Sequence, residues 1–207
     1  MKGKAEKITK KGAGITPIRA NQIIVIRHAQ KPTKKPRLKG ILENGRQDPE
    51  SLTVRGWQHA GALAAAFGIE EKALSNVHIA SPDFIFAAGT GKKKARNGSK
   101  KVTLGSHSKR PQQTISLMAA KLGLTPVITF SKGEEEVLVQ DVLGRKGTIL
   151  ICWQHQDIAA IGNLIMGNKT TVPQTWAQDR YDLVYVFDRV NDGWSFRQFF
   201  HERLMPS

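Results

Sequence analysis

Arg27 and His28 follow a run of four aliphatic residues, in the stretch IIVIRHAQKP. An uninterrupted hydrophobic run of this length, closed by Pro32, predicts a buried strand of a parallel sheet. Ligands of open α/β sheets bind at the carboxyl ends of the strands. A guanidinium that keeps its charge, placed beside an imidazole that can act as a nucleophile, is suited to binding and attacking a phosphoryl group.

Two further segments bring the same residue types to the ends of expected elements. The stretch SHSKRPQQT places Arg110 at the start of a helix, and the hydrophobic run GTILICWQ is followed directly by His155. In a parallel sheet these ends meet at one edge, where two arginines, two histidines and the N-termini of helices would converge on one anion. We therefore predict a phosphate site at this edge, with cations that stabilise the transition state of phosphoryl transfer.

Hydrophobic runs alternate with helical patterns along most of the chain. We expect strands at 23–27, 84–89, 126–130 and 147–154, helices at 51–68, 108–123, 134–144 and 155–167, and a final strand pair at 182–188 and 194–200. This alternation predicts an α/β fold, a three-layer α/β/α sandwich with a mainly parallel sheet. The length of 207 residues suits a single catalytic domain, expected at 21–207 after a basic, flexible arm at 1–20.

The positive charge of the chain is confined to three segments. The formal net charge is +15, and residues 1–20, 31–40 and 89–101 together carry +16, so the remainder is close to neutral. Segments rich in Lys, Gly and Ser bury too little apolar surface to become ordered, and we expect 89–101 to be a mobile basic loop. Two interpretations stay open, solvated charge runs or a positive rim that attracts an anionic substrate.

The remaining composition narrows the class of protein. A single cysteine, Cys152, excludes an internal disulfide framework and fits a reducing compartment. No run of about 18 apolar residues predicts a membrane span, and the basic start lacks the apolar region of a secretory signal. We expect a cytoplasmic protein that uses neither membrane nor metal, since no HExxH motif, cysteine cluster or acidic triad is present. Nothing in the sequence indicates the oligomeric state.

These motifs, in this order, resemble those of the histidine phosphatase superfamily, the group of cofactor-dependent phosphoglycerate mutases and many phosphatases. The family's Arg-His-Gly signature, the RHG motif, corresponds to Arg27-His28-Ala29 at the end of the first strand. A helix start of the form Leu-Thr-x-x-Gly followed by Gln, a Ser-x-x-x-Arg-x-x-Gln-Thr stretch and a second histidine come next. The matching residues are Leu52, Thr53, Gly56, Gln58, Ser106, Arg110, Gln113, Thr114 and His155. The resemblance covers roughly residues 22 to 167.

The resemblance implies a phosphoglycerate mutase-like fold and a metal-independent phosphatase that hydrolyses a small phosphomonoester. His28 would be the nucleophile that forms a phosphohistidine, and Arg27, Arg110 and His155 would hold the phosphoryl oxygens. No cofactor is implied.

Two departures from the family pattern bear on the substrate. Ala29 replaces the usual Gly, and Lys34 stands where the mutases have an Asn that helps to bind phosphate. Lys34 would then meet phosphate as a point charge, unless its loop runs elsewhere. Alternative functions are a phosphoglycerate mutase-like phosphotransferase and a catalytically weak polyanion-binding protein. A nucleic-acid partner is not expected, because the basic segment 89–101 contains no aromatic residue on which bases could stack.

The proton donor to the leaving group is the least determined part of the site. In the mutase-like branch a Glu some distance after the second Arg has this role, which corresponds to the run Glu134-Glu135-Glu136, and we favour Glu135 over Glu134. In the acid-phosphatase branch the donor is an Asp directly after the second His. Here Asp157 comes one residue late and would lie in the first turn of a helix, where a carboxylate commonly compensates the helix dipole.

Overall fold

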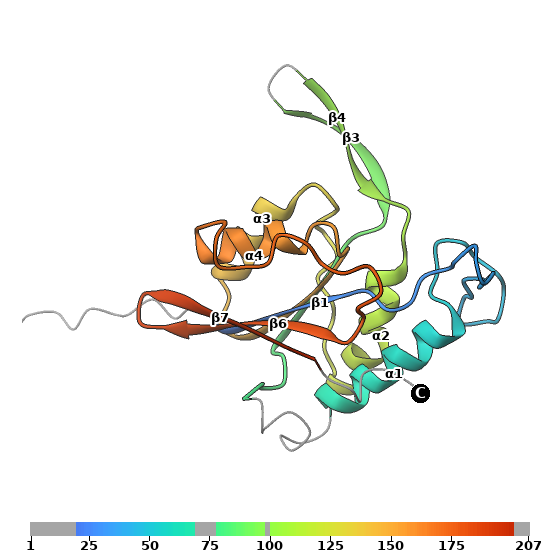
Figure 1. Ribbon diagram of the computed structural model, residues 1–207, viewed down its shortest axis with the longest axis horizontal. Coiled ribbons are helices and arrows are strands. Elements are labelled where there is room, and N and C mark those ends of the chain that lie inside the picture. Colours follow the sequence, from blue (N-terminus) through green and yellow to red (C-terminus); the bar gives the residue numbers. More distant parts are fainter. Residues whose placement is uncertain (1–19, 69–77, 98–99, 201–207) are drawn as a thin grey trace, which may run out of the picture.

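A five-stranded sheet with the strand order β2-β5-β1-β6-β7 forms the centre of the protein (Figure 1). The computed structural model describes residues 20–68, 78–97 and 100–200, so the expected arm at 1–20 lies outside them except for its last residue. The strands of the sheet are β1 (Ala20–Arg27), β2 (Phe84–Ala87), β5 (Gly147–Trp153), β6 (Leu183–Val190) and β7 (Gly193–Phe200). β2, β5 and β1 are parallel, whereas β6 pairs antiparallel with both β1 and β7. The predicted mainly parallel sheet is confirmed.

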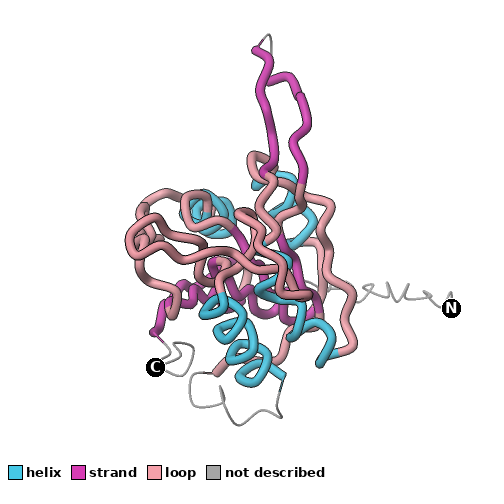
Figure 2. Tube along the Cα trace, turned by 90° about the vertical axis from the view of Figure 1, so that its right-hand side faces the viewer, coloured by secondary structure: helices cyan, strands magenta, loops and turns pink. Residues whose placement is uncertain are grey.

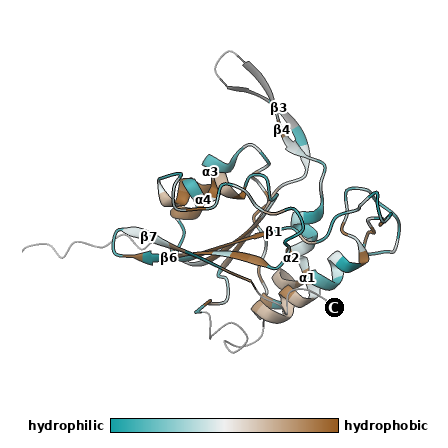
Figure 3. Ribbon diagram, in the orientation of Figure 1, coloured by the Kyte–Doolittle hydropathy of each residue, from teal (hydrophilic) through white to brown (hydrophobic). Residues whose placement is uncertain are grey.

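Four helices cover the two faces of this sheet. They are α1 (Val54–Gly68) and α2 (Arg110–Leu122) on one face, and α3 (Glu135–Leu143) and α4 (Ile158–Met166) on the other. Successive side chains of β1 point to opposite faces of the sheet, so the strand packs against both helix layers. Ile24 belongs to the hydrophobic cluster of α1 and α2, and Val25 belongs to that of α3 and α4. In Figure 3 the hydrophobic colouring accordingly gathers on the central strands and on the helices beside them. The predicted three-layer sandwich is confirmed. No helix of the described ranges is long and apolar enough to cross a membrane.

The parallel register brings the carboxyl ends of three strands to one edge. Arg27, the last residue of β1, lies opposite Trp153, the last residue of β5. Ala87, at the end of β2, lies opposite Cys152. The residues that follow each strand therefore meet there, as the sequence predicts.

The strand expected at 126–130 is not formed. Val127 forms an isolated bridge with Phe86, through bonds from its N–H to the Ile85 carbonyl and from the Ala87 N–H to its own carbonyl, and the Phe130 carbonyl accepts from the Gly89 N–H. Pro126 has no N–H to donate, and Ile128 is exposed on one side of the segment. This prediction was wrong because a short apolar run does not reveal how many of its residues continue the backbone pairing with a neighbouring strand.

The loop expected at 89–101 is instead part of a β-hairpin. β3 (Gly91–Asn97) and β4 (Lys100–Ser106) form a two-stranded antiparallel sheet that projects from the body of the protein (Figures 1 and 2). The Gly105 N–H donates to the Lys132 carbonyl at 2.7 Å, which ties the base of the hairpin to the segment before α3. The composition argument failed here because it counts buried apolar surface, whereas backbone hydrogen bonds alone can pair two strands.

Candidate active site

His28 lies just beyond the end of β1 and is almost completely buried, with 3% of its surface exposed. Its Nδ1 lies 2.7 Å from the Ala29 carbonyl oxygen. Because a carbonyl only accepts, Nδ1 carries the proton and Nε2 keeps a free lone pair. Burial lowers the pKa of His28 to about 3, and the charges of Arg27 and Arg110 act in the same direction. The imidazole is therefore neutral and able to act as a nucleophile at neutral pH.

Arg27 is held by the loop that precedes β6. Its Nη1 donates to the carbonyls of Ala177, Gln178 and Arg180 at 3.3, 2.8 and 3.2 Å, and the guanidinium carbon lies 3.9 Å from the centre of the Tyr181 ring. Only 1% of the side chain surface is exposed, and this burial lowers the pKa of the guanidinium. Nε and Nη2 are buried without a partner in the described structure. One nitrogen thus fixes the group while two donors remain for a ligand.

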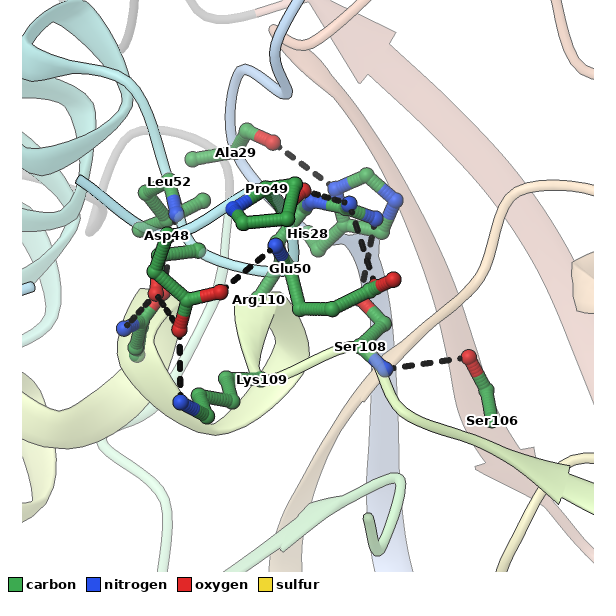
Figure 4. Close-up of polar contacts among 12 residues, drawn as sticks. His28, Ala29, Asp48, Pro49, Glu50, Leu52, Ser106, Ser108, Lys109 and Arg110 are labelled. Atoms are coloured by element: carbon green, nitrogen blue, oxygen red, sulfur yellow. Dashed lines mark hydrogen bonds and ion pairs between the residues drawn. The ribbon is translucent and has the colours of Figure 1, made fainter. Parts of the chain in front are cut away.

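Arg110 is the first residue of α2 and lies beside His28 (Figure 4). Its Nη1 donates to Ser108 Oγ at 3.0 Å, and Nη2 donates to the Pro49 carbonyl at 2.8 Å. Nη2 also forms an ion pair with Glu50 at 3.4 Å. The Nε–H is buried and has no partner among the described residues. Its position at a helix N-terminus adds the partial positive charge of the helix to that of the guanidinium.

His155 faces His28 from the turn after β5. The ring centroids are 6.5 Å apart and the planes are nearly perpendicular, at 80°. Burial, with the charges of Arg27, Lys31 and Lys132 in addition, lowers the pKa of His155 to about 4. The structure therefore brings together all four residues that the strand ends predicted.

Buried polar atoms without a described hydrogen-bond partner, most of them donors, are concentrated in this region. Buried polar groups are normally paired, yet the described structure shows no partner for several here. They are Arg27 Nε and Nη2, Arg110 Nε, His155 Nδ1 and both side-chain polar atoms of Gln154. Several buried donors around one neutral imidazole form an arrangement that can accept a small anion with several oxygens. Gln154 was not selected from the sequence, since a glutamine at a strand end carries no charge signal.

Two of the candidate proton donors lie at the start of α3. Glu135 Oε1 accepts hydrogen bonds from Trp153 Nε1 and from the Gly133 N–H, both at 2.9 Å. No described group bonds to its second oxygen, Oε2. Glu134 Oε2 accepts from the Ser131 N–H at 2.9 Å and so closes the turn in front of the helix. Trp153 links Glu135 to the strand end from which His155 follows.

The third candidate, Asp157, precedes α4. Its Oδ2 forms an ion pair with Lys132 Nζ at 3.2 Å. Burial raises the pKa of Asp157, Lys132 opposes this shift, and the charge of Glu135 adds to it. The carboxylates of Asp157 and Glu135 therefore share one neighbourhood, on the α3/α4 side of the sheet edge.

Two solved structures share this fold over most of the chain. A candidate alpha-ribazole-5'-P phosphatase from Escherichia coli K-12 aligns with 90% of this chain and 100% of its own, at a TM-score of 0.50 and 13% identity. A mycobacterial glucosyl-3-phosphoglycerate phosphatase in complex with VO3 aligns with 86% of this chain and 97% of its own, at 0.50 and 10%. The chain has the histidine phosphatase fold. No protein-family model and no curated protein sequence matches it.

In this histidine phosphatase fold, the other motif residues hold the framework of the site. The Ala29 N–H donates to Thr114 Oγ1, and the Leu52 N–H donates to Gln113 Oε1, both at 2.9 Å. These bonds attach the first turns of α2 to the segment after His28 and to the segment before α1. The motif thus positions Arg110 relative to His28.

Gly56 allows α1 to approach the loop after His28 closely. A Cβ at this position would lie 2.6 Å from the Gln30 carbonyl oxygen. His59, one turn later in α1, is buried against the same residue, Gln30, and its Nδ1 lies 3.2 Å from Gln30 Oε1. Burial lowers the pKa of His59 to about 4. His59 matches no motif, and only the helix packing reveals that it lies under the site.

No contact is described between Lys34 and Arg27, His28, Arg110 or His155. Lys34 is exposed and lines a cavity formed by its own loop. Lys31 is the half-buried lysine whose charge acts on His155 and whose own pKa is lowered by burial and by Arg27 and Arg110. The loop after His28 therefore presents Lys31 to the site, and no described contact supports Lys34 as a direct phosphate ligand.

Proposed function

We propose that the protein is a phosphatase of the histidine phosphatase superfamily, which hydrolyses a small phosphomonoester through a phosphohistidine on His28. The proposal depends on one observation, the set of unpaired buried donors around an imidazole with a free Nε2. The oxygens of a phosphoryl group would accept from Arg27 Nε and Nη2, from Arg110 Nε and from His155. Each of these bonds to a charged group is worth about 1.5–3 kcal/mol.

In the first step, the lone pair on His28 Nε2 attacks phosphorus while the bond from phosphorus to the ester oxygen breaks. The leaving oxygen takes a proton from a carboxylic acid and departs as the alcohol. The phosphorylated ring still carries its proton on Nδ1, and the Ala29 carbonyl accepts that proton's hydrogen bond, which stabilises the positive charge on the ring.

In the second step, water attacks phosphorus and the phosphorus–nitrogen bond breaks, which returns the electron pair to Nε2. The carboxylate formed in the first step takes a proton from the water, so the acid is restored. The sum is one ester and one water converted to one alcohol and one phosphate. The guanidinium groups of Arg27 and Arg110 neutralise the phosphoryl charge in both steps, and no step requires a metal.

We assign the proton transfers to Glu135. Both of its hydrogen bonds go to Oε1, so Trp153 and the Gly133 N–H fix the carboxylate while Oε2 remains available for a proton. Glu134 uses its Oε2 to close the turn before α3, and Asp157 is paired with Lys132. Either would have to give up its present contact before it could transfer a proton.

The structurally similar proteins favour hydrolysis over transfer to a second acceptor. One is named as a candidate alpha-ribazole-5'-P phosphatase and the other as a glucosyl-3-phosphoglycerate phosphatase in complex with VO3. Both proteins are named as phosphatases of a small phosphorylated molecule, and we propose the same kind of activity for this chain.

The test is replacement of the nucleophile. We expect His28→Ala to lower kcat for p-nitrophenyl phosphate by at least about 10⁴-fold and to abolish acid-labile phosphate on the denatured protein. The exposed His107→Ala serves as the control and should leave both unchanged. Full activity in His28→Ala would sink the proposal. Phosphate trapped on His28 but released only to an added alcohol or sugar would favour the phosphotransferase instead.

A further inference from the structure

A cavity with a volume of about 520 Å³ lies in the loops next to the phosphate site. We call it the basic cavity. Residues that line it include Pro32, Lys34, Arg37, Leu38, Lys39 and Pro49. Its volume falls within the range of pockets that bind small molecules, about 300–1,000 Å³. No step of the proposed hydrolysis uses it.

The basic cavity shares a wall with the phosphate site. The Pro49 carbonyl, on the cavity wall, accepts the hydrogen bond from Arg110 Nη2 at 2.8 Å. Figure 4 shows Pro49 and Glu50 beside Arg110 and His28. Pro32 also lines the cavity and comes directly after the half-buried Lys31 of the loop that follows His28. The cavity therefore adjoins the phosphate site through Pro49 and through the residues after Lys31.

The charge of the cavity is positive and is not neutralised from within. Three cations line it, and no carboxylate of the described residues pairs with them; they are Lys34, Arg37 and Lys39. Among the lining residues the one carboxylate is Asp48, which already accepts from Lys109, from the Glu50 N–H and from Ser51 Oγ. These bonds hold the pKa of Asp48 low, at about 2, so the carboxylate stays engaged with its own partners.

Backbone hydrogen bonds shape the cavity before any ligand arrives. Thr33 and Leu38 exchange two bonds, at 3.2 and 3.1 Å, and the Asp48 N–H donates to the Gly40 carbonyl at 2.9 Å. Gly40 permits this approach, because a Cβ there would lie 2.2 Å from the Asp48 carbonyl oxygen and 2.6 Å from that of Ser51. A preformed pocket loses less conformational entropy on binding a ligand than a flexible loop would.

We propose that the basic cavity binds the leaving group of the substrate and that this leaving group carries a second anionic group, a phosphate or a carboxylate. The inference rests on the proposed function. Lys34, Arg37 and Lys39 would bind the second anion, and the apolar surface of Leu38, which is 45% exposed, would contact the carbon skeleton between the two charges. A short carbon chain with an anion at each end is the substrate class that fits this arrangement.

The test compares pairs of substrates that differ only in the second anion. Linear alkanediol bisphosphates of increasing length are set against alkyl monophosphates of the same length, at one ionic strength. We expect kcat/KM to favour the bisphosphate by about 10²-fold at the best length. The double variant Arg37→Met/Lys39→Met should reduce this preference at least about tenfold. The control variant, Lys92→Met on β3, removes one exposed charge outside the cavity and should leave the preference as it was.

Calorimetry separates this inference from the proposed function. His28→Ala, which cannot form the phosphohistidine, should bind butanediol bisphosphate about tenfold more weakly once Arg37 and Lys39 are also replaced by Met. The inference is overturned if the double variant keeps the wild-type preference for the bisphosphate in kcat/KM and if its replacements leave the affinity for butanediol bisphosphate unchanged. This holds even if His28 proves essential. Conversely, a binding difference without any hydrolysis would support the cavity as an anion site and refute the phosphatase.

Discussion

The two sides of the candidate active site differ in how firmly their charged groups are held. On the α1/α2 side, Arg110 is bonded through three partners and the loop after His28 is attached to Thr114 of α2. On the α3/α4 side, Glu135 is only half-buried and one of its oxygens has no described bond.

This difference corresponds to what each side is proposed to do. An anion site benefits from donors whose positions are already fixed, because their reorganisation would otherwise weaken binding in the transition state. A group that gives and takes a proton needs an oxygen that is free to change partners and a path to water. The α1/α2 side, which we call the binding side, therefore holds its charged groups in fixed positions. The α3/α4 side, which we call the acid–base side, leaves one carboxylate oxygen of Glu135 without a described bond.

The largest effect should follow from loosening the binding side. Arg110→Lys keeps the charge but cannot bond to Ser108, Pro49 and a phosphoryl oxygen together. We expect kcat/KM to fall about 10²–10³-fold for every phosphate ester, measured by steady-state kinetics. Arg145→Lys, two residues after the end of α3, is the matched control, because Arg145 pairs with Asp141 of α3 on the other side of the sheet. If both variants lose activity equally, the binding side has no special role.

A change on the acid–base side should depend on the leaving group. We expect Glu135→Gln to lower kcat about 10²-fold for an alkyl phosphate, whose alkoxide needs a proton, and by much less for p-nitrophenyl phosphate, whose phenolate leaves unaided. Glu136→Gln, in the same helix turn but exposed, is the control. Should Asp157→Asn or Glu134→Gln show this leaving-group dependence instead, that residue is the donor.

The smallest effect concerns the histidines, which are buried as neutral groups. The pKa values of His28, His59 and His155 are lowered from 6.5 to about 3, 4 and 4. Between pH 6.5 and about pH 4 the unfolded chain therefore binds protons that the folded protein does not, so the free energy of unfolding falls as the pH falls and is fully restored above pH 6.5.

His59→Gln isolates one of these groups without touching the proposed chemistry. It should remove about one proton from the uptake on unfolding, which urea denaturation between neutral pH and about pH 5 measures as a shallower pH dependence. His107→Gln, at an exposed position, should leave the slope unchanged. An unchanged slope in His59→Gln would mean that this histidine is not held neutral by the fold.

The residues predicted most directly from the sequence are those whose position follows from a local pattern. Arg27 and His28 end a hydrophobic run, Arg110 begins a helix, and His155 follows another run, so each could be placed at an element end without knowledge of its partners. The parallel register of β1 and β5 then brings the ends together.

Lys31, His59 and the basic cavity could not be predicted in this way. No pattern distinguishes Lys31 from Lys34, because the course of a loop depends on contacts such as that of Gly40 with the 48–51 segment. His59 occupies an ordinary helical position, and its burial follows from the approach of α1 to the loop after His28 at Gly56. The hairpin of β3 and β4 escaped the composition argument because its pairing is made by the backbone.

By itself the order of residue types determined the layers of the fold and the four side chains at the sheet edge, because periodicity and element ends are properties of neighbouring residues. Tertiary structure alone decided which nitrogens remain unpaired, which carboxylate has a free oxygen and where the second cluster of cations lies. These features arise from contacts between segments that are far apart in the chain. A small shift of one loop can remove a hydrogen-bond acceptor and leave the donor unpaired. Local sequence patterns carry no record of such contacts.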